Sequence, residues 1–358
     1  MRVRTVVALV LAGAMSGCTT QPAMPLDTIT NASLAARSEI SPEQRLRELI
    51  ADEQRINTVF GRLVTSNVEL CGERYVPSFG FRLWSLEDFD PPNRPAAIAA
   101  FGLGDRLQVY ATAEGQPAWN AGVRAGDILA GIEGRDLAPG SAGRTQFAER
   151  VTEGLIKRGN VRFVFERAGK RHKLRLNALK SCPFAVTLAV GDDPNAATDG
   201  KSVYVTSGML DFAPQDRDLA VVLGHEIAHA IAGHPQKLAP KPLKVERGIV
   251  GTMFDTAEGL GETAYSAVSG LAGARRNSID FEMEADYVGL YLAARAGYDV
   301  SDAAEIWRRL EAEYPSTADG GWTHPSSEER FAAMRRTAEE IAARRADDQP
   351  LIPGKPGS

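Results

Sequence analysis

The chain has 358 residues, of which 24% are charged, and its formal net charge is −5 at pH 7. This acidic balance argues against nucleic acid as a partner, because binding nucleic acid requires a basic surface that replaces phosphate counterions. The length is sufficient for two domains with cores of their own. Beyond the first residues, no apolar run is long enough to span a bilayer.

The N-terminus is typical of an exported protein. Two arginines precede an apolar run over residues 6–15, and small residues then lead to Cys18. This pattern indicates a signal peptide over residues 1–17. Residues 15–18, Met-Ser-Gly-Cys, resemble the lipobox of bacterial lipoproteins, which implies that Cys18 is lipidated and becomes the first mature residue. The alternative is an ordinary cleaved signal with an incidental cysteine.

A tether and a helix come next. Residues 18–40 contain few large apolar side chains and read as a tether. A helix is then predicted over residues 42–66, because Ser41 and Pro42 supply a cap and a first-turn proline and Gln44 completes a capping-box pattern. Apolar residues recur along it at helical spacing, so one face of this helix must be buried.

Short strands with glycine punctuation begin near Tyr75, and residues 115–134 read GQPAWNAGVRAGDILAGIEG. The Pro-Ala pair, short helix, Ala-Gly and Gly-Asp before a strand resemble the PDZ domain family. Residues 161–179 add two alternating strands around Gly169, as the closing hairpin of that fold would. The resemblance covers about residues 73–180 and implies one small β-rich domain.

The peptide groove of such a domain can be located from the loop that binds the peptide's carboxylate. PDZ domains take an extended peptide as an added strand and hold its carboxylate on loop amides. Ser78, Phe79, Gly80 and Phe81 match that loop best, and the Phe-Gly-Leu-Gly run at residues 101–104 is the rival. The alternative is a PDZ-like module that packs on its neighbour and binds no peptide.

The stretch HEIAH, residues 225–229, predicts a metal site. On a helix, residues four apart lie one turn above each other, so His225 and His229 can offer both imidazoles to one tetrahedral metal. Glu226 lies close by without having to ligate, which is where a general base for the attacking water belongs. The alternative is two buried core histidines. His234, five positions after His229, we interpret as a helix-end residue and not a ligand.

A hydrolytic zinc site needs a third protein ligand and an open position. A predicted helix over residues 279–296 offers Glu282, Glu284 and Asp286. Glu282 and Asp286 share one face, whereas Glu284 points nearly the opposite way. Because an inward carboxylate is costly unless it meets a cation, we expect Glu282 to be the third ligand and Asp286 to orient a histidine. Glu284 is the other candidate.

With these residues in place, the region from about residue 184 to residue 330 resembles the HtpX-type zinc metallopeptidases, relatives of the CAAX prenyl protease and of the Oma-type and BepA-type proteases. The resemblance rests on four pieces of sequence. These are Asn195-Ala196 with the strand at 203–206 and Gly208-Met209-Leu210, the HEIAH stretch, Glu282-x-x-x-Asp286, and Thr323-His324-Pro325 followed by Arg330.

The resemblance implies roles for these residues and one zinc ion per chain. In that family the first glutamate of the ExxxD piece, here Glu282, is the third ligand. His324 is placed near the metal, where it either blocks the open position at rest or stabilises the oxyanion, with Arg330 supporting it. The family fold surrounds a small sheet with helices, and the edge strand of that sheet, here residues 203–206, aligns the substrate backbone beside the metal.

The resemblance also implies an architecture. Family members have a long helix before the first strand, so the PDZ-like domain is inserted within the protease, and we predict an α+β chain that is mainly helical around a small sheet. The expected segments are an N-terminal helix packing on the protease over 41–70, the PDZ-like domain over 71–182, the zinc metallopeptidase domain over 183–345 and a tail over 346–358. Cys71 and Cys182 stand at the ends of the insert and, in an oxidising compartment, are expected to pair.

The sequence thus predicts a zinc-dependent endopeptidase held in the bacterial envelope by a lipid on Cys18, with a PDZ-like domain that selects protein or peptide substrates. Thr19 follows the cysteine, which by analogy with enteric sorting favours the outer membrane facing the periplasm. The alternative is a latched or non-catalytic chaperone or binding lipoprotein with the same fold. Substrate, cleavage preference and oligomeric state are left open.

Overall fold

The computed structural model describes residues 40–72, 75–238, 279–314 and 328–354, and this part is an α+β structure, the class that the sequence predicts. Its helices are α2 (Pro42–Ser66), α3 (Arg94–Phe101), α4 (Pro117–Asn120), α5 (Gly140–Arg158), α6 (Ser207–Phe212), α7 (Asp216–Ala232), α8 (His234–Leu238), α10 (Ile279–Arg295), α11 (Ala303–Glu313) and α12 (Glu328–Ala346). Its strands are β1 (Val76–Ser78), β2 (Phe81–Trp84), β3 (Gln108–Thr112), β4 (Ile128–Ile132), β5 (Arg135–Asp136), β6 (Asn160–Arg167), β7 (Lys170–Asn177), β8 (Leu179–Ser181), β9 (Ala185–Ala189), β10 (Ala196–Thr198) and β11 (Ser202–Thr206).

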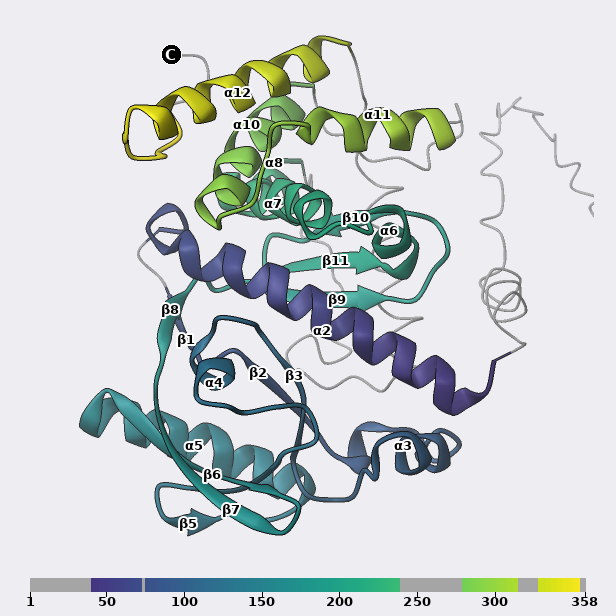
Figure 1. Cartoon of the computed structure of the whole chain (residues 1–358), viewed down its shortest axis with the longest axis vertical. Coiled ribbons are helices and arrows are strands. Elements are labelled where there is room, and N and C mark those ends of the chain that lie inside the picture. The colour runs from purple at the N-terminus through teal and green to yellow at the C-terminus, as the bar shows by residue number, and fades with distance from the viewer. Residues whose placement is uncertain (1–39, 73–74, 239–278, 315–327, 355–358) are drawn as a thin grey trace, which may run out of the picture.

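Helix α2 runs between two halves of the molecule, which lie above and below it in Figure 1. The upper, helical half contains β9, β10 and β11 with helices α6, α7, α8, α10, α11 and α12, and the lower, sheet half contains the elements from β1 to β8. The helix begins as the sequence predicts, because the Ser41 hydroxyl accepts a hydrogen bond from the Gln44 backbone N–H. Along its buried face, Ile56 and Leu63 pack into the core of the helical half. Leu46, nearer its start, packs with α3 and β3. One amphipathic helix therefore contributes to both cores.

The helical half contains a three-stranded sheet in the order β10-β11-β9, with β9 parallel and β10 antiparallel to β11. This order shows that the prediction for residues 203–206 was wrong. They belong to β11, whose five residues are all buried and whose backbone pairs on both sides. A strand paired on both sides cannot take up a substrate strand. The edge strand that packs against α7 is β10.

The other half is built on the sheet β2-β3-β4-β6-β7, with β5 paired to β4. The hairpin β6–β7 turns at Gly169, which has a φ of +74° and so adopts the left-handed conformation that glycine tolerates best. Helix α5 packs against β4 and β6. Aromatic rings fill the core, where Phe163 meets Phe79 and Phe81 edge to face, an arrangement that aromatic pairs prefer.

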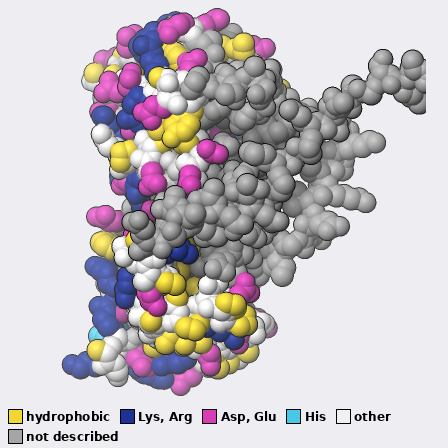
Figure 2. Space-filling view, turned by 90° about the vertical axis from the view of Figure 1, so that its right-hand side faces the viewer, with side chains coloured by type: hydrophobic (Ala, Val, Ile, Leu, Met, Phe, Trp, Pro, Cys, Tyr) yellow, Lys and Arg dark blue, Asp and Glu magenta, His cyan; other side chains and the backbone are white. Residues whose placement is uncertain are grey.

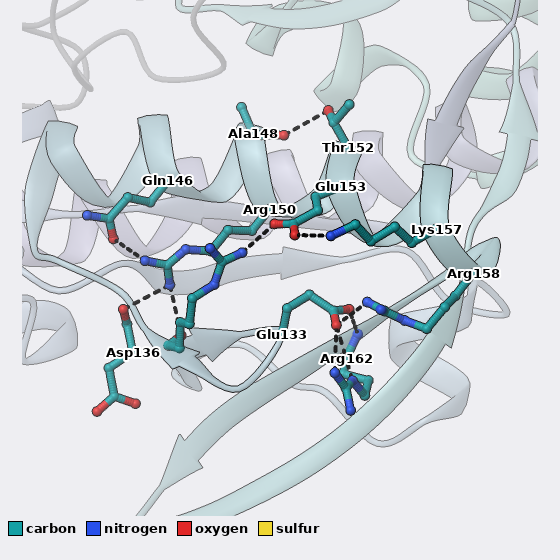
Figure 3. Close-up of polar contacts among 11 residues, drawn as sticks. Glu133, Asp136, Gln146, Ala148, Arg150, Thr152, Glu153, Lys157, Arg158 and Arg162 are labelled. Atoms are coloured by element: carbon teal, nitrogen blue, oxygen red, sulfur yellow. Dashed lines mark hydrogen bonds and ion pairs between the residues drawn. The ribbon is translucent and has the colours of Figure 1, made fainter.

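Ion pairs fasten α5 to the neighbouring strands (Figure 3). Glu133, in the turn between β4 and β5, has a φ of +55°, which is costly for a residue with a side chain. Its carboxylate accepts the backbone N–H of Arg162 at 2.8 Å and forms ion pairs with the guanidinium groups of Arg158 and Arg162. These contacts offset the strain of the turn. Nearby, Glu153 pairs with Lys157 one turn along α5.

Figure 2 shows Lys and Arg side chains gathered along one edge of this half, at the lower left of the view. The β6–β7 hairpin, residues 160–177, belongs to this half and carries six Lys or Arg residues and one Glu. None of the described helices is both long and apolar enough to cross a membrane.

The chain enters and leaves the sheet half side by side, because β1 pairs antiparallel with β8. Just outside this two-stranded ribbon, Cys71 and Cys182 form a disulfide with their α carbons 5.6 Å apart. The bridge joins residues 111 positions apart, and for a loop of that length chain entropy gives a stabilisation of about 4–5 kcal/mol.

A buried polar cluster joins the two halves. The Arg82 guanidinium, from β2, donates to Asn57 on α2 at 3.0 Å and to the backbone carbonyl of Val186 on β9 at 3.5 Å. It also lies 3.6 Å from the carboxylate of Glu53 on α2. Burial raises the pKa of Glu53, and the attraction of Arg82 opposes that rise. Together with the disulfide, this cluster fixes how the sheet half is attached.

Candidate metal centre

Helix α7 carries the HEIAH stretch and is almost entirely buried from Leu219 to His229. It begins with Asp216 and Asp218 in its first turn, where negative charge complements the helix dipole. It ends at Gly233, whose φ of +68° provides the left-handed cap. The buried stretch is apolar except for His225, Glu226 and His229, so these polar groups require partners inside the protein.

Helix α10 supplies those partners because it crosses α7 at very short range. A side chain on Gly289 of α10 would place its Cβ 2.8 Å from the backbone nitrogen of His225. A Cβ on Gly224 of α7 would likewise lie 2.8 Å from the carbonyl oxygen of Gly289. Two glycines therefore let the backbones touch one residue before the first histidine. The close approach brings Glu282 and Asp286 to the histidines.

Three side-chain donors converge between the helices. The Nε2 atoms of His225 and His229 are 3.0 Å apart, and each lies 3.4 Å from a carboxylate oxygen of Glu282. The three side chains are 0–2% exposed. Within the described residues they are the one group of His, Cys, Asp or Glu side chains close enough together to hold a metal ion.

This donor set fits zinc. Zinc ligands lie at about 2.0–2.2 Å in a tetrahedral arrangement, which puts neighbouring donor atoms about 3.3 Å apart. The separations of 3.0 and 3.4 Å are close to that value. Two imidazoles and one carboxylate are also the ligands of hydrolytic zinc sites, which keep the fourth position open. The structure thus brings together the three residues that the sequence predicts as ligands.

The Nδ1 atom of His225, which faces away from the ligand cluster, contacts the buried ion pair of Asp286 and Arg330. This atom lies 2.9 Å from Oδ1 of Asp286, and Asp286 receives two hydrogen bonds from the Arg330 guanidinium, at 2.7 and 2.9 Å. Arg330 also lies 3.3 Å from Glu282, and the Trp307 ring packs against both His225 and Arg330. Asp286, which the sequence predicts to orient a histidine, thus lies against His225.

The pKa values of His225, Asp286 and Arg330 are all shifted from their ordinary values by burial and by the charges of their neighbours. Burial favours neutral His225, but the carboxylates of Asp286 and Glu282, which accept hydrogen bonds from the protonated ring and attract its charge, outweigh burial and raise the pKa of His225 to about 10. Burial likewise acts to raise the pKa of Asp286, yet Arg330 and His225 bring it below its ordinary value. Despite its burial, Arg330 has a raised pKa because of Asp286 and Glu282. The metal-free site therefore favours a protonated His225.

The outer nitrogen of His229 has a different partner, which sequence reasoning missed. His229 Nδ1 lies 2.8 Å from Nδ1 of His234, and His234 Nε2 lies 3.3 Å from a carboxylate oxygen of Glu284. His234 is 0% exposed and stacks on Phe281 with the rings 4.2 Å apart and 10° from parallel. Burial lowers the pKa of His234, and Glu284 opposes that change. The five-residue spacing of the histidines across Gly233 was the available signal.

The remaining predicted residues lie elsewhere. Ser78 ends β1, Gly80 has a φ of +77°, and Phe81 begins β2. The Phe79 ring is 7% exposed and belongs to the core of the sheet half. A side chain at Gly80 would clash with Gln116, which explains the glycine there. Cys18 and His324 lie outside the described residues, as do residues 1–17 and most of the tether at 18–40.

Comparison with known proteins agrees with this geometry. Residues 164–338 match the model of peptidase family M48. This match covers just under half of the chain. The chain is similar to the mitochondrial metalloendopeptidase OMA1 of Saccharomyces cerevisiae, with 27% identity over 160 residues, which is 41% of this chain and 45% of the relative. It is also similar to the beta-barrel assembly-enhancing protease of Escherichia coli K12, with 30% identity over 189 residues, covering 48% and 38% of the two chains.

The chain thus matches less than half the length of these relatives. The metalloendopeptidase OMA1 of Bos taurus gives a similar result, with 27% identity over 208 residues that cover 52% of this chain and 39% of the relative. A solved structure, the HtrA3 PDZ domain bound to a phage-derived ligand, is matched over 30% of this chain and 89% of its own, with 15% identity and a TM-score of 0.23. We draw no conclusion from a likeness that low.

Proposed function

We propose that this protein is a zinc-dependent metalloendopeptidase. The observation that carries the proposal is the convergence of His225, His229 and Glu282 at ligand spacing, with Glu226 beside them on α7. Similarity to OMA1 and to the beta-barrel assembly-enhancing protease supports the same class of enzyme. Zinc bound here would polarise the scissile carbonyl and lower the pKa of water at its open position.

The protein's own residues complete the chemistry. Glu226 is 1% exposed and directly follows the first histidine, and we assign to its carboxylate the acceptance of the proton of the attacking water and its later transfer to the leaving amine. Arg330 holds Glu282 and Asp286 in position through its ion pairs. From the sequence, we further propose that His324 blocks the open position at rest or stabilises the oxyanion.

Cleavage of an unfolded protein tests the function. Wild-type protein should cleave casein or an unfolded outer-membrane β-barrel protein, and a chelator should stop cleavage until zinc is restored. Glu226→Gln should keep the metal and lose nearly all activity, because it removes the base but no ligand. If wild-type protein holds zinc yet cleaves nothing while preventing aggregation of the same substrates, the non-catalytic chaperone alternative is correct.

We also propose how substrates reach the site. The edge strand β10 packs against α7, and in the described structure it pairs on one side only, with β11. We assign the alignment of an extended substrate to β10 in place of β11. The sheet half is proposed as a PDZ-like selector whose Ser78–Phe81 loop receives a peptide carboxylate. Binding of C-terminal peptides, lost when the terminal carboxylate is amidated, would support that role; binding unaffected by amidation would contradict it.

Localisation in the bacterial envelope, with a lipid on Cys18 and the outer membrane as the destination, is proposed from the sequence and from the similarity to an Escherichia coli protease named for β-barrel assembly. Membrane fractionation tests it. Wild-type protein should sediment with outer membranes, and Cys18→Ala should become soluble in the periplasm. An anchored Cys18→Ala protein would contradict the lipid assignment.

A further inference from the structure

We propose that His234 and Glu284 form a positioning relay that fixes the orientation and tautomer of the ligand His229. The inference rests on the proposed zinc site and deepens it. Its basis is an unbroken line of contacts, from Nε2 of His229 at the ligand cluster through the facing Nδ1 atoms of the two histidines to the carboxylate of Glu284.

The positions of the protons on His229 and His234 follow from the proposed binding of zinc through Nε2 of His229. A histidine that binds metal through Nε2 carries its proton on Nδ1, so His229 must donate from Nδ1. The atom 2.8 Å away is Nδ1 of His234, which must therefore be the acceptor. His234 then carries its own proton on Nε2, which faces Glu284 at 3.3 Å. One arrangement of two neutral rings satisfies every contact.

Local structure holds His234 in this role. The left-handed turn at Gly233 ends α7 and directs the next residue back beside α7, where α8 begins. The imidazole lies flat on the Phe281 ring, from the same helix that carries Glu282 and Glu284. Gln236 of α8 donates to the backbone carbonyl of Asp199, in the turn after β10. The relay is thus attached to α7, α10 and the small sheet.

The relay requires an acceptor at Nδ1 and not merely a ring of the right size. His234→Leu keeps apolar packing on Phe281 but leaves the Nδ1–H of His229 facing carbon, and loss of such outer partners costs metal sites about 10–100-fold in affinity. His234→Asn puts an amide oxygen near the former Nδ1 position, so it should recover most of that affinity. Thr152→Leu, at an exposed position of α5 in the sheet half, is the control for introducing a leucine away from the site.

The test uses full-length protein with Glu226→Gln to prevent self-cleavage. Zinc affinity by chelator competition should fall about 10–100-fold for His234→Leu, recover for His234→Asn and stay unchanged for Thr152→Leu. Nitrogen-15 spectra of labelled histidines should show His234 protonated on Nε2 in the zinc-loaded protein. Unchanged affinity of His234→Leu, no rescue by asparagine, or a proton on Nδ1 of His234 would overturn the relay. If the parent protein binds no zinc at all, the proposed function fails together with the relay.

Discussion

The two histidines proposed as zinc ligands differ in the residues that contact their Nδ1 atoms. His225 Nδ1 lies 2.9 Å from Asp286, a buried carboxylate that pairs with Arg330, and both members of that ion pair are at most 4% exposed. His229 instead faces His234, a buried imidazole whose other nitrogen meets Glu284, a side chain that is 31% exposed. One side of the site is a rigid ionic support in the protein interior. The other is a pair of neutral imidazoles that ends at the partly exposed carboxylate of Glu284.

The residues that contact the two histidines should therefore affect two different free energies, that of unfolding and that of zinc binding. Removing one member of a buried ion pair leaves an uncompensated charge, so the cost falls on folding as well as on metal binding. Removing a neutral partner costs mainly the orientation of the metal ligand, and water can take over part of the role of a partly exposed partner such as Glu284. Variants on the two sides should therefore separate stability from metal affinity.

The largest effect is expected for Asp286→Ala, which leaves Arg330 buried without its bidentate partner. We expect a loss of about 3–5 kcal/mol in the free energy of unfolding, together with severely weakened zinc binding. Urea unfolding of the chelated protein measures the first. Glu328→Ala is the matched control, because Glu328 is 81% exposed in its pair with Arg308 and such a pair contributes about 0–1 kcal/mol. Equal losses in both variants would contradict the account.

Next in size is Gly289→Ala, which places a methyl group against the backbone of His225. Overpacking of this kind costs about 1–3 kcal/mol, and pushing α10 away from α7 should also weaken zinc binding. Thermal unfolding and zinc titration measure the two effects. Gly104→Ala serves as control, since a Cβ there has nothing within 4 Å. A fully stable Gly289→Ala protein would show that the helices tolerate separation.

The third effect is the release of a proton when zinc binds, which we expect from the His225 side of the site. Buried His225 has a pKa raised to about 10 by Asp286 and Glu282, so the metal-free site holds a proton at pH 8 that zinc must displace. Zinc binding should therefore release about one proton from His225. Because of this proton, zinc affinity should fall about tenfold for each unit by which the pH lies below 10. Calorimetry in buffers of different ionisation enthalpy measures the release. Binding without proton release at pH 8 would contradict a protonated His225.

The smallest effect is expected for Glu284→Gln. The amide oxygen can still accept from His234 Nε2, and the side chain is partly exposed, so only the charge is lost. Zinc affinity should fall less than it does for His234→Leu, and the free energy of unfolding should change by less than about 1 kcal/mol. Chelator competition on the two variants side by side decides the order, and a larger loss in Glu284→Gln would reverse the assignment.

Sequence reasoning succeeded where one helix determines geometry. The i, i+4 spacing placed His225 and His229 on one face of α7, and the same spacing placed Glu282 and Asp286 on one face of α10. It also predicted α2 from Ser41 and the pairing of Cys71 with Cys182.

It failed where several segments meet. The central position of β11 depends on pairing with two other strands, which its own residues do not encode. The role of His234 depends on the turn at Gly233 and on contacts with α10. The close crossing at Gly224 and Gly289 is likewise visible only when both helices are placed.

Zinc content by native mass spectrometry tests the central claim most directly. Wild-type, Glu282→Gln and Glu284→Gln proteins are each loaded with one equivalent of zinc and freed of excess metal. We predict one zinc ion per chain in the wild type and in Glu284→Gln, and none in Glu282→Gln, because Glu282 is the carboxylate at ligand distance from both histidines. A loaded Glu282→Gln protein beside an empty Glu284→Gln protein would contradict the site as described.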